Sequence, residues 1–150
     1  VDKAESMEVI KAREEVERAR REAEAAASRN AKKEAVLATA SELEILAALI
    51  QCEAGGEPYE GQIAVGAVVM NRVRSGGYPN SITEVIYASG QFVPASKGKM
   101  ESLILEKNIR SSCVQAAQEA ISGTCNVGDA LHFRRKGNRQ GLIIGNHVFW

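Results

Sequence analysis

Apolar positions in the first forty residues repeat as a heptad. The seam they form consists of Val9, Ala12, Val16, Ala19, Ala23 and Ala26, and Glu and Arg fill most of the remaining positions. This spacing predicts one long charged helix over residues 1–38. Because Val and Ala bury little area, we expect a solvated helical spacer or the end of a longer coil. Helix-mediated self-association, or binding of a partner protein, is the alternative.

The pattern changes at Ser41, where a second kind of chain begins. Ser41 and Glu44 fit a capping box, and apolar residues at helical spacing follow as far as Ile50. Gly55 and Gly56 are expected to end this helix. The next segment, 61–74, is apolar almost all round and predicts a central helix, with a strand as the alternative.

Further along, the elements become shorter. Ser81 and Glu84 fit a second capping box, for a short helix ending at Tyr87, and residues 91–100 have the composition of a loop. A helix over 103–122 should stop at Gly123.

The chain ends in β-type sequence. Residues 130–135 and 142–149 predict two strands of a small terminal hairpin, joined through a Gly-rich turn. Residues 41–150 therefore read as one α+β domain that is mainly helical, preceded by the long charged helix.

Composition limits the function. The 19 basic and 19 acidic residues cancel, so no overall basic field indicates a nucleic-acid partner. No apolar run is long enough to predict a membrane span. Two histidines, His132 and His147, are too few for a zinc site without a cysteine, and we expect no metal or other cofactor. A bridge between Cys113 and Cys125 stays open.

Three carboxylates cluster where the second helix must end. Continuing the buried stripe from Ile50 by three residues places Glu53 on the inner face, at the negative end of the helix dipole. Both conditions favour a protonated carboxyl, which is what delivery of a proton to a glycosidic oxygen requires. Glu57 and Glu60 follow the break and should stay ionised. The alternative is a group of surface glutamates without a catalytic role.

The residues around Glu53 carry a resemblance to a known family. The run from Glu53 to Gln62 reads Glu-Ala-Gly-Gly-Glu-Pro-Tyr-Glu-Gly-Gln and continues to Val73. Later blocks are Tyr78-Pro79-Asn80, Gly90-Gln91-Phe92, Ala130-Leu131-His132-Phe133 and Ile144-Gly145-Asn146-His147-Val148-Phe149. In this order, across residues 41–150, they resemble the spore cortex-lytic and cell wall hydrolase family of the SleB/CwlJ type.

The resemblance implies a lysozyme-like fold related to lytic transglycosylases. It implies an extracytoplasmic enzyme that cleaves peptidoglycan glycan strands, in the cell wall or the spore cortex, without a cofactor. Glu53 corresponds to the catalytic glutamate. The substrate-binding candidates are Glu57, Tyr59, Glu60, Gln62, Asn71, Gln91, Phe92 and His132. For Gln62, Asn71 and Gln91, hydrogen bonding to buried backbone groups is an equal alternative. For Tyr59 and Phe92, a place in the core is the favoured alternative.

The chain departs from the family at several points. Many members carry arginine where Gly55 stands, and a tyrosine pair where this chain has His132 and Phe133. A hydrolytic muramidase, an N-acetylmuramoyl-L-alanine amidase and a non-catalytic peptidoglycan-binding module are the alternative functions. A cysteine peptidase built on Cys52 is a weaker one. The basic residues Arg134, Arg135, Lys136 and Arg139 are either a solvated loop or a contact for anionic wall polymer.

Overall fold

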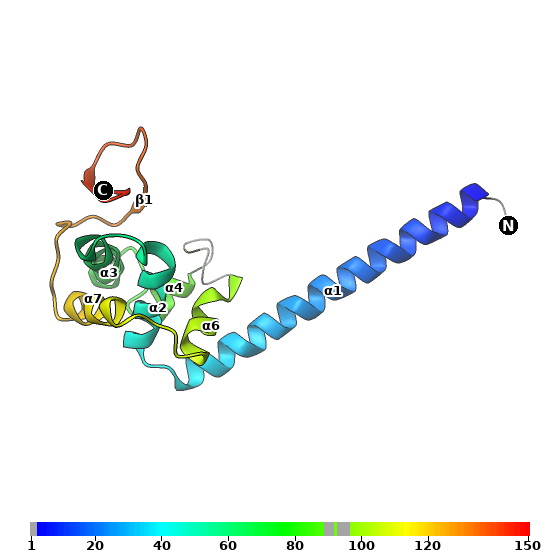
Figure 1. Cartoon of the computed structure of the whole chain (residues 1–150), viewed down its shortest axis with the longest axis horizontal. Helices are drawn as coiled ribbons and strands as arrows, with labels where there is room; N and C mark the ends of the chain where they lie inside the picture. The colour runs from blue at the N-terminus through cyan, green and yellow to red at the C-terminus, as the bar shows by residue number, and fades with distance from the viewer. Residues whose placement is uncertain (1–2, 89–91, 93–96) are drawn as a thin grey trace.

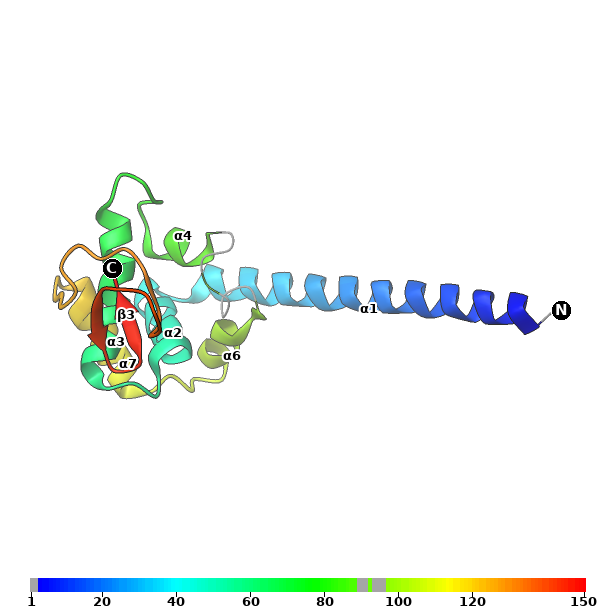
Figure 2. The ribbon, with the colours of Figure 1, turned by 90° about the horizontal axis from the view of Figure 1, so that it is seen from above.

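Helix α1, Lys3–Thr39, projects as one unbroken rod from the rest of the molecule (Figures 1 and 2). The computed structural model describes residues 3–88, 92 and 97–150. Side chains 7–25 of α1 are all exposed, whereas Val36 is buried and Lys33 Nζ lies 4.9 Å above the Tyr87 ring. The last turns of α1 therefore pack on the domain, which the heptad pattern did not indicate. None of the described helices is long and apolar enough to cross a membrane.

Helices α2, Glu42–Ala54, and α3, Tyr59–Arg74, form the centre of the domain. The predicted capping box is present: Ser41 Oγ accepts from the Glu44 N–H, and the Glu44 carboxylate accepts from the Ser41 N–H. Residues 45–50 of α2 and 61–70 of α3 are buried without a break. The helical prediction for 61–74 is confirmed. Its burial agrees with a sequence that is apolar on almost every side.

Helix α7, Ser111–Ile121, packs against both α2 and α3. A Cβ added at Gly66 of α3 would lie 2.8 Å from Ala120 Cβ, so glycine is what allows α3 and α7 to approach this closely. The short helices α4, Ile82–Tyr87, and α6, Lys99–Leu105, flank α2. Ser81 caps α4 by accepting from the Glu84 N–H, as predicted.

The single helix predicted over 103–122 is wrong, because the chain breaks between α6 and α7. Lys107 adopts φ 54°, and the Lys107 and Asn108 N–H groups donate to the Ile104 and Leu103 carbonyls. This Schellman pattern ends α6 without the glycine that usually marks it. The same pattern at Gly123, φ 108°, ends α7 where the sequence predicted.

The predicted two-stranded hairpin is a three-stranded antiparallel sheet in the order β1-β3-β2. The strands are β1, Phe133–Arg135, β2, Leu142–Ile144, and β3, His147–Phe149. Gly145, at φ 59°, reverses the chain inside the segment predicted as one strand. The central strand β3 pairs Phe149 with both Phe133 and Leu142, and Val148 and Phe149 are buried.

All three cysteines are free, so the structure contains no bridge between Cys113 and Cys125. Cys113 is buried in α7 and Cys125 is exposed.

Candidate functional site

Glu53 lies in the last turn of α2 and is half-buried. Burial raises the pKa of its carboxyl above the ordinary value for glutamate. The helix phase predicted that Glu53 faces inward and that its pKa is raised. At neutral pH such a group retains a larger protonated fraction than a surface glutamate, as a general acid requires.

The end of α2 is fixed to the α6–α7 connection by two side chains. Gln51 Nε2 donates to the Asn108 carbonyl at 3.1 Å, and its Oε1 accepts from the Arg110 N–H at 2.6 Å. Arg110 Nη1 in turn donates to the Gly55 carbonyl at 2.6 Å. Positive charge near the negative end of α2 is therefore supplied by Arg110 rather than by residue 55. No local pattern predicts these contacts, because the partners lie more than fifty residues apart in the chain.

A hollow of about 300 Å³ opens between Cys52 of α2 and the start of α6. It is lined by Cys52, Lys97, Gly98, Lys99, Ser102 and Leu103. Burial, and then the charge of Glu53, raise the pKa of the Cys52 thiol to about 11. A thiol that stays protonated at neutral pH is a poor nucleophile, which argues against a cysteine peptidase.

Glu57 is held by the turn between β2 and β3. The Asn146 N–H donates to Glu57 Oε1 at 2.6 Å, and Asn146 Nδ2 donates to Oε2 at 2.9 Å. These bonds lower the pKa of Glu57, and the side chain is only 9% exposed. A Cβ at Gly145 would lie 2.7 Å from Oε1, so the turn approaches Glu57 closely. Glu57 is thus an ionised carboxylate that fastens the sheet to the start of α3.

Three more candidates surround the start of α3. The Tyr59 hydroxyl donates to Glu119 of α7, and burial together with this bond raises the pKa of Tyr59 to about 12. Gln62 is 5% exposed and donates weakly, at 3.4 Å, to the Glu57 carbonyl. Its Oε1 has no partner among the described residues. Glu60 is exposed.

Asn71 and Phe92 have inward-facing roles. Asn71 Nδ2 donates to the carbonyls of Gly128 and Ala130, both at 2.9 Å, which is the backbone role named as its alternative. Phe92 is buried, with its ring 6.3 Å from that of Phe133. Gln91 lies outside the described residues.

The Trp150 ring contacts His132 and two basic residues, Arg134 and Arg139. The rings of His132 and Trp150 stack at 5.4 Å, and the guanidinium carbons of Arg139 and Arg134 lie 4.2 Å and 5.9 Å from the Trp150 centroid. His132 is exposed and Trp150 is half-buried. An aromatic face with exposed cations is suited to a sugar or an anionic polymer. Sequence reasoning did not single out Trp150.

Glu101 is a second buried carboxylate that the sequence pattern did not indicate. It is 1% exposed and accepts a hydrogen bond from the Tyr87 hydroxyl. Its Oε2 has no partner among the described residues. Glu101 lies in α6, which starts at Lys99, inside the segment whose composition predicts a loop.

Comparison with known proteins identifies the domain. Residues 56–150 match the family model described as Cell Wall Hydrolase. A spore cortex-lytic enzyme of Oceanobacillus iheyensis is 34% identical over 118 residues, which cover 73% of this chain and 41% of the relative. One from Bacillus subtilis is 31% identical over 118 residues, 73% of this chain and 37% of the relative. The chain thus spans less than half the length of these curated relatives.

A solved structure agrees with the sequence relatives. The catalytic domain of the germination-specific lytic transglycosylase SleB from Bacillus anthracis superposes with a TM-score of 0.57 at 27% identity. The match covers 72% of this chain and 92% of that domain. The predicted lysozyme-like, mainly helical fold is confirmed. Taken with the family match over residues 56–150, this shows that the chain belongs to the cell wall hydrolase family of enzymes.

Proposed function

We propose that this domain cleaves peptidoglycan glycan strands between N-acetylmuramic acid and N-acetylglucosamine as a lytic transglycosylase, with Glu53 as the general acid and base. The observation that carries the proposal is the half-buried Glu53 carboxyl in the last turn of α2, where burial raises its pKa. The relatives named spore cortex-lytic enzyme and lytic transglycosylase support the same reaction class.

In this mechanism Glu53 acts twice. Its protonated carboxyl first donates a proton to the glycosidic oxygen as the bond from that oxygen to C1 of the muramic acid breaks. The carboxylate left behind then accepts the proton of the muramic acid C6 hydroxyl, whose oxygen attacks C1. The products are a 1,6-anhydromuramic acid end and a free glucosamine 4-hydroxyl, and Glu53 is again protonated.

The hydrogen bonds of Glu57 argue against a hydrolytic route in which Glu57 is the second carboxylate. A retaining or inverting glycosidase usually needs a second carboxylate free to act as nucleophile or to activate water. Both Glu57 oxygens accept hydrogen bonds from Asn146, and the side chain is nearly buried. In a transglycosylase the substrate supplies the nucleophile, so a second free carboxylate is unnecessary.

The substrate class is proposed from the relatives named spore cortex-lytic enzyme. Spore cortex and vegetative wall share the glycan strand, and either places the enzyme outside the cytoplasmic membrane. We propose that the exposed side chains of Glu60 and His132 contact the sugars, whereas the buried Gln62 shapes the site from behind. Glu57, Tyr59, Asn71 and Phe92 would shape the cleft indirectly, through the contacts described above.

Mass spectrometry of the products tests the proposal. Purified vegetative peptidoglycan and spore cortex would each be digested with the wild type, with Glu53→Gln, and with the exposed-residue control Glu106→Gln. We expect 1,6-anhydromuramic ends from the wild type and the control, and none from Glu53→Gln. Reducing muramic acid ends would indicate a muramidase. Free stem peptides on intact glycan would indicate an amidase, and products unchanged in Glu53→Gln would remove Glu53 from the chemistry.

A further inference from the structure

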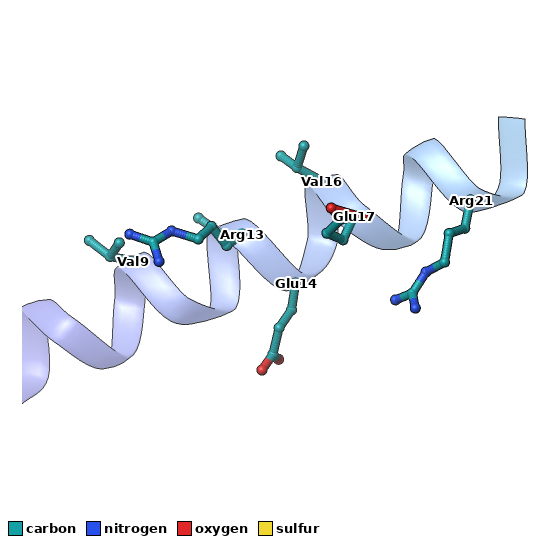
Figure 3. Close-up of a pocket in the computed structure, with 7 residues that line it drawn as sticks. Val9, Arg13, Glu14, Val16, Glu17 and Arg21 are labelled. Atoms are coloured by element: carbon teal, nitrogen blue, oxygen red, sulfur yellow. The ribbon is translucent and has the colours of Figure 1, made fainter. Parts of the chain in front are cut away.

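An unpartnered apolar seam runs along the projecting part of α1. Val9, Ala12, Val16, Ala19 and Ala23 form it, and all five are exposed, Val16 by 69%. Figure 3 shows Val9 and Val16 on the same side of the helix, with Glu14 and Arg21 pointing away from it. In heptad notation Val9, Val16 and Ala23 occupy a positions, and Ala12 and Ala19 occupy d positions.

The charges beside the seam are segregated by sign. The g positions on one edge hold Glu8, Glu15 and Glu22, and the e positions on the other edge hold Arg13 and Arg20. In a parallel two-stranded coil, each g residue faces the e residue five positions later on the second helix. Glu8 would then face Arg13, and Glu15 would face Arg20, and symmetry makes each pair occur twice.

The same charges disfavour the antiparallel arrangement. There g faces g and e faces e, so two identical chains would bring Glu against Glu and Arg against Arg. Like charges at these positions oppose association. The edge pattern therefore selects both the identity of the occupant, a second copy of this chain, and its direction.

We infer that α1 pairs with a second copy of the chain as a parallel two-stranded coiled coil over residues 9–23. Val9 and Val16 supply the β-branched a residues that are typical of two-stranded coils. The pairing ends there because α1 soon reaches its own domain, where the Arg29 side chain lies against Gly98. Since Val and Ala bury little area, the dimer is weak, and its edge pairs make it weaker in salt.

Parallel pairing places both domains at the same end of the coil. If the domains bind glycan as proposed above, the dimer presents two sites to one insoluble polymer, and bivalency raises its apparent affinity. The coil itself does not depend on that activity. Sedimentation therefore tests the coil, and analysis of the glycan products tests the activity, so either proposal can fail without the other.

Sedimentation equilibrium of the full chain, at about 5 to 500 µM in low salt, measures the pairing. We expect the wild type to follow a monomer–dimer equilibrium. Glu8→Arg with Glu15→Arg makes both edges basic, and Arg13→Glu with Arg20→Glu makes both acidic. Each double variant alone should dimerise about tenfold more weakly or worse, because four attractive pairs become repulsive. An equimolar mixture of the two should recover the dimer as a heterodimer.

The control keeps the net charge change but moves it off the seam. Glu14→Arg with Glu24→Arg, at the outer f and b positions, should dimerise as the wild type does. Circular dichroism at 222 nm verifies that every variant keeps α1 helical. Ala12→Leu with Ala19→Leu, which enlarges the d residues, should strengthen the dimer.

Three outcomes would overturn the inference. One is a wild type that remains monomeric across the whole concentration range. Another is a mass that corresponds to three or more chains. The last is a dimer that neither charge reversal weakens.

Discussion

The projecting part of α1 and the domain at its end differ in what holds their shape. Residues 7–25 of α1 are all exposed. Within this stretch, the side chains of Arg20 and Glu17 form an ion pair at 2.6 Å. Such an exposed pair contributes about 0.5 kcal/mol or less. In the domain, α2 and α3 each bury a run of consecutive residues. The projecting part of α1 should therefore tolerate substitutions on its outer faces. Substitutions inside the domain should lower the free energy of unfolding at most positions.

The largest contrast concerns activity and is expected at Glu53. Glu53→Gln removes the proton donor and should lower kcat/KM about 10²- to 10⁴-fold. Glu17→Gln on α1 is the matched control and should leave turnover unchanged. Release of soluble muropeptides from peptidoglycan measures both. Equal activity in the two variants would contradict the assignment of Glu53.

The pH dependence of that activity follows from the same carboxyl. Because burial raises the pKa of Glu53, the protonated form that donates to the substrate is lost as pH rises through a value above that of a free glutamate. Because the buried charge is disfavoured, the folded state also loses stability as pH rises from the ordinary glutamate pKa through the raised pKa of Glu53. Glu53→Gln should therefore unfold at the same temperature as the wild type or higher at pH 7. A lower temperature would show that the ionised carboxylate stabilises the fold.

Substitution at the contact between α3 and α7 should lower the stability of the domain strongly. Gly66→Leu forces atoms into a space where even a Cβ lies 2.8 Å from Ala120 and 3.2 Å from Ile50. We expect a loss of about 1–3 kcal/mol in the free energy of unfolding, measured by urea denaturation. Gly76→Leu, where nothing lies within 4 Å, and Ala25→Leu on the outer face of α1 should each change it by less than about 0.5 kcal/mol.

Glu57 tests how the sheet is fastened to the helices. Glu57→Gln places an amide where two Asn146 donors need acceptors, and should cost about 1–3 kcal/mol. Since the folded-state pKa of Glu57 is depressed, its contribution is complete above the ordinary glutamate pKa and declines as pH falls through the folded value. Thermal unfolding from pH 7 downward should separate wild type and variant less and less. A constant difference would mean that the charge of Glu57 is not involved.

The smallest effect distinguishes the two ends of α1. Val36→Ala removes side-chain atoms that are fully buried and should cost about 1–2 kcal/mol. Val16→Ala removes the same atoms from an exposed site and should change domain stability by less than about 0.5 kcal/mol. Thermal unfolding of the domain at low protein concentration compares them. Equal effects would show that the last turns of α1 do not belong to the core.

Local patterns in the sequence determined much of this protein. The capping box at Ser41, the N-cap at Ser81, the largely apolar segment 61–74 and the stop at Gly123 each depend on residues within a few positions of one another. The burial of Glu53 followed from a helix phase established by the preceding turns. These features were predictable because neighbours in sequence are neighbours on a helix.

Tertiary structure decided the features that join distant residues. The break at Lys107 is stabilised by Gln51, the third strand depends on how β3 pairs with both β1 and β2, and Arg110 replaces a charge absent at Gly55. The ionised state of Glu57 likewise depends on Asn146, 89 residues away. Local sequence alone determined the helices α1 to α4 and the half-buried position of Glu53. Only the tertiary structure brings together the distant partners that determine the charge of Glu57 and the position of the α6–α7 connection. Contacts between residues so far apart in the chain follow no regular sequence spacing, so a local pattern cannot predict them.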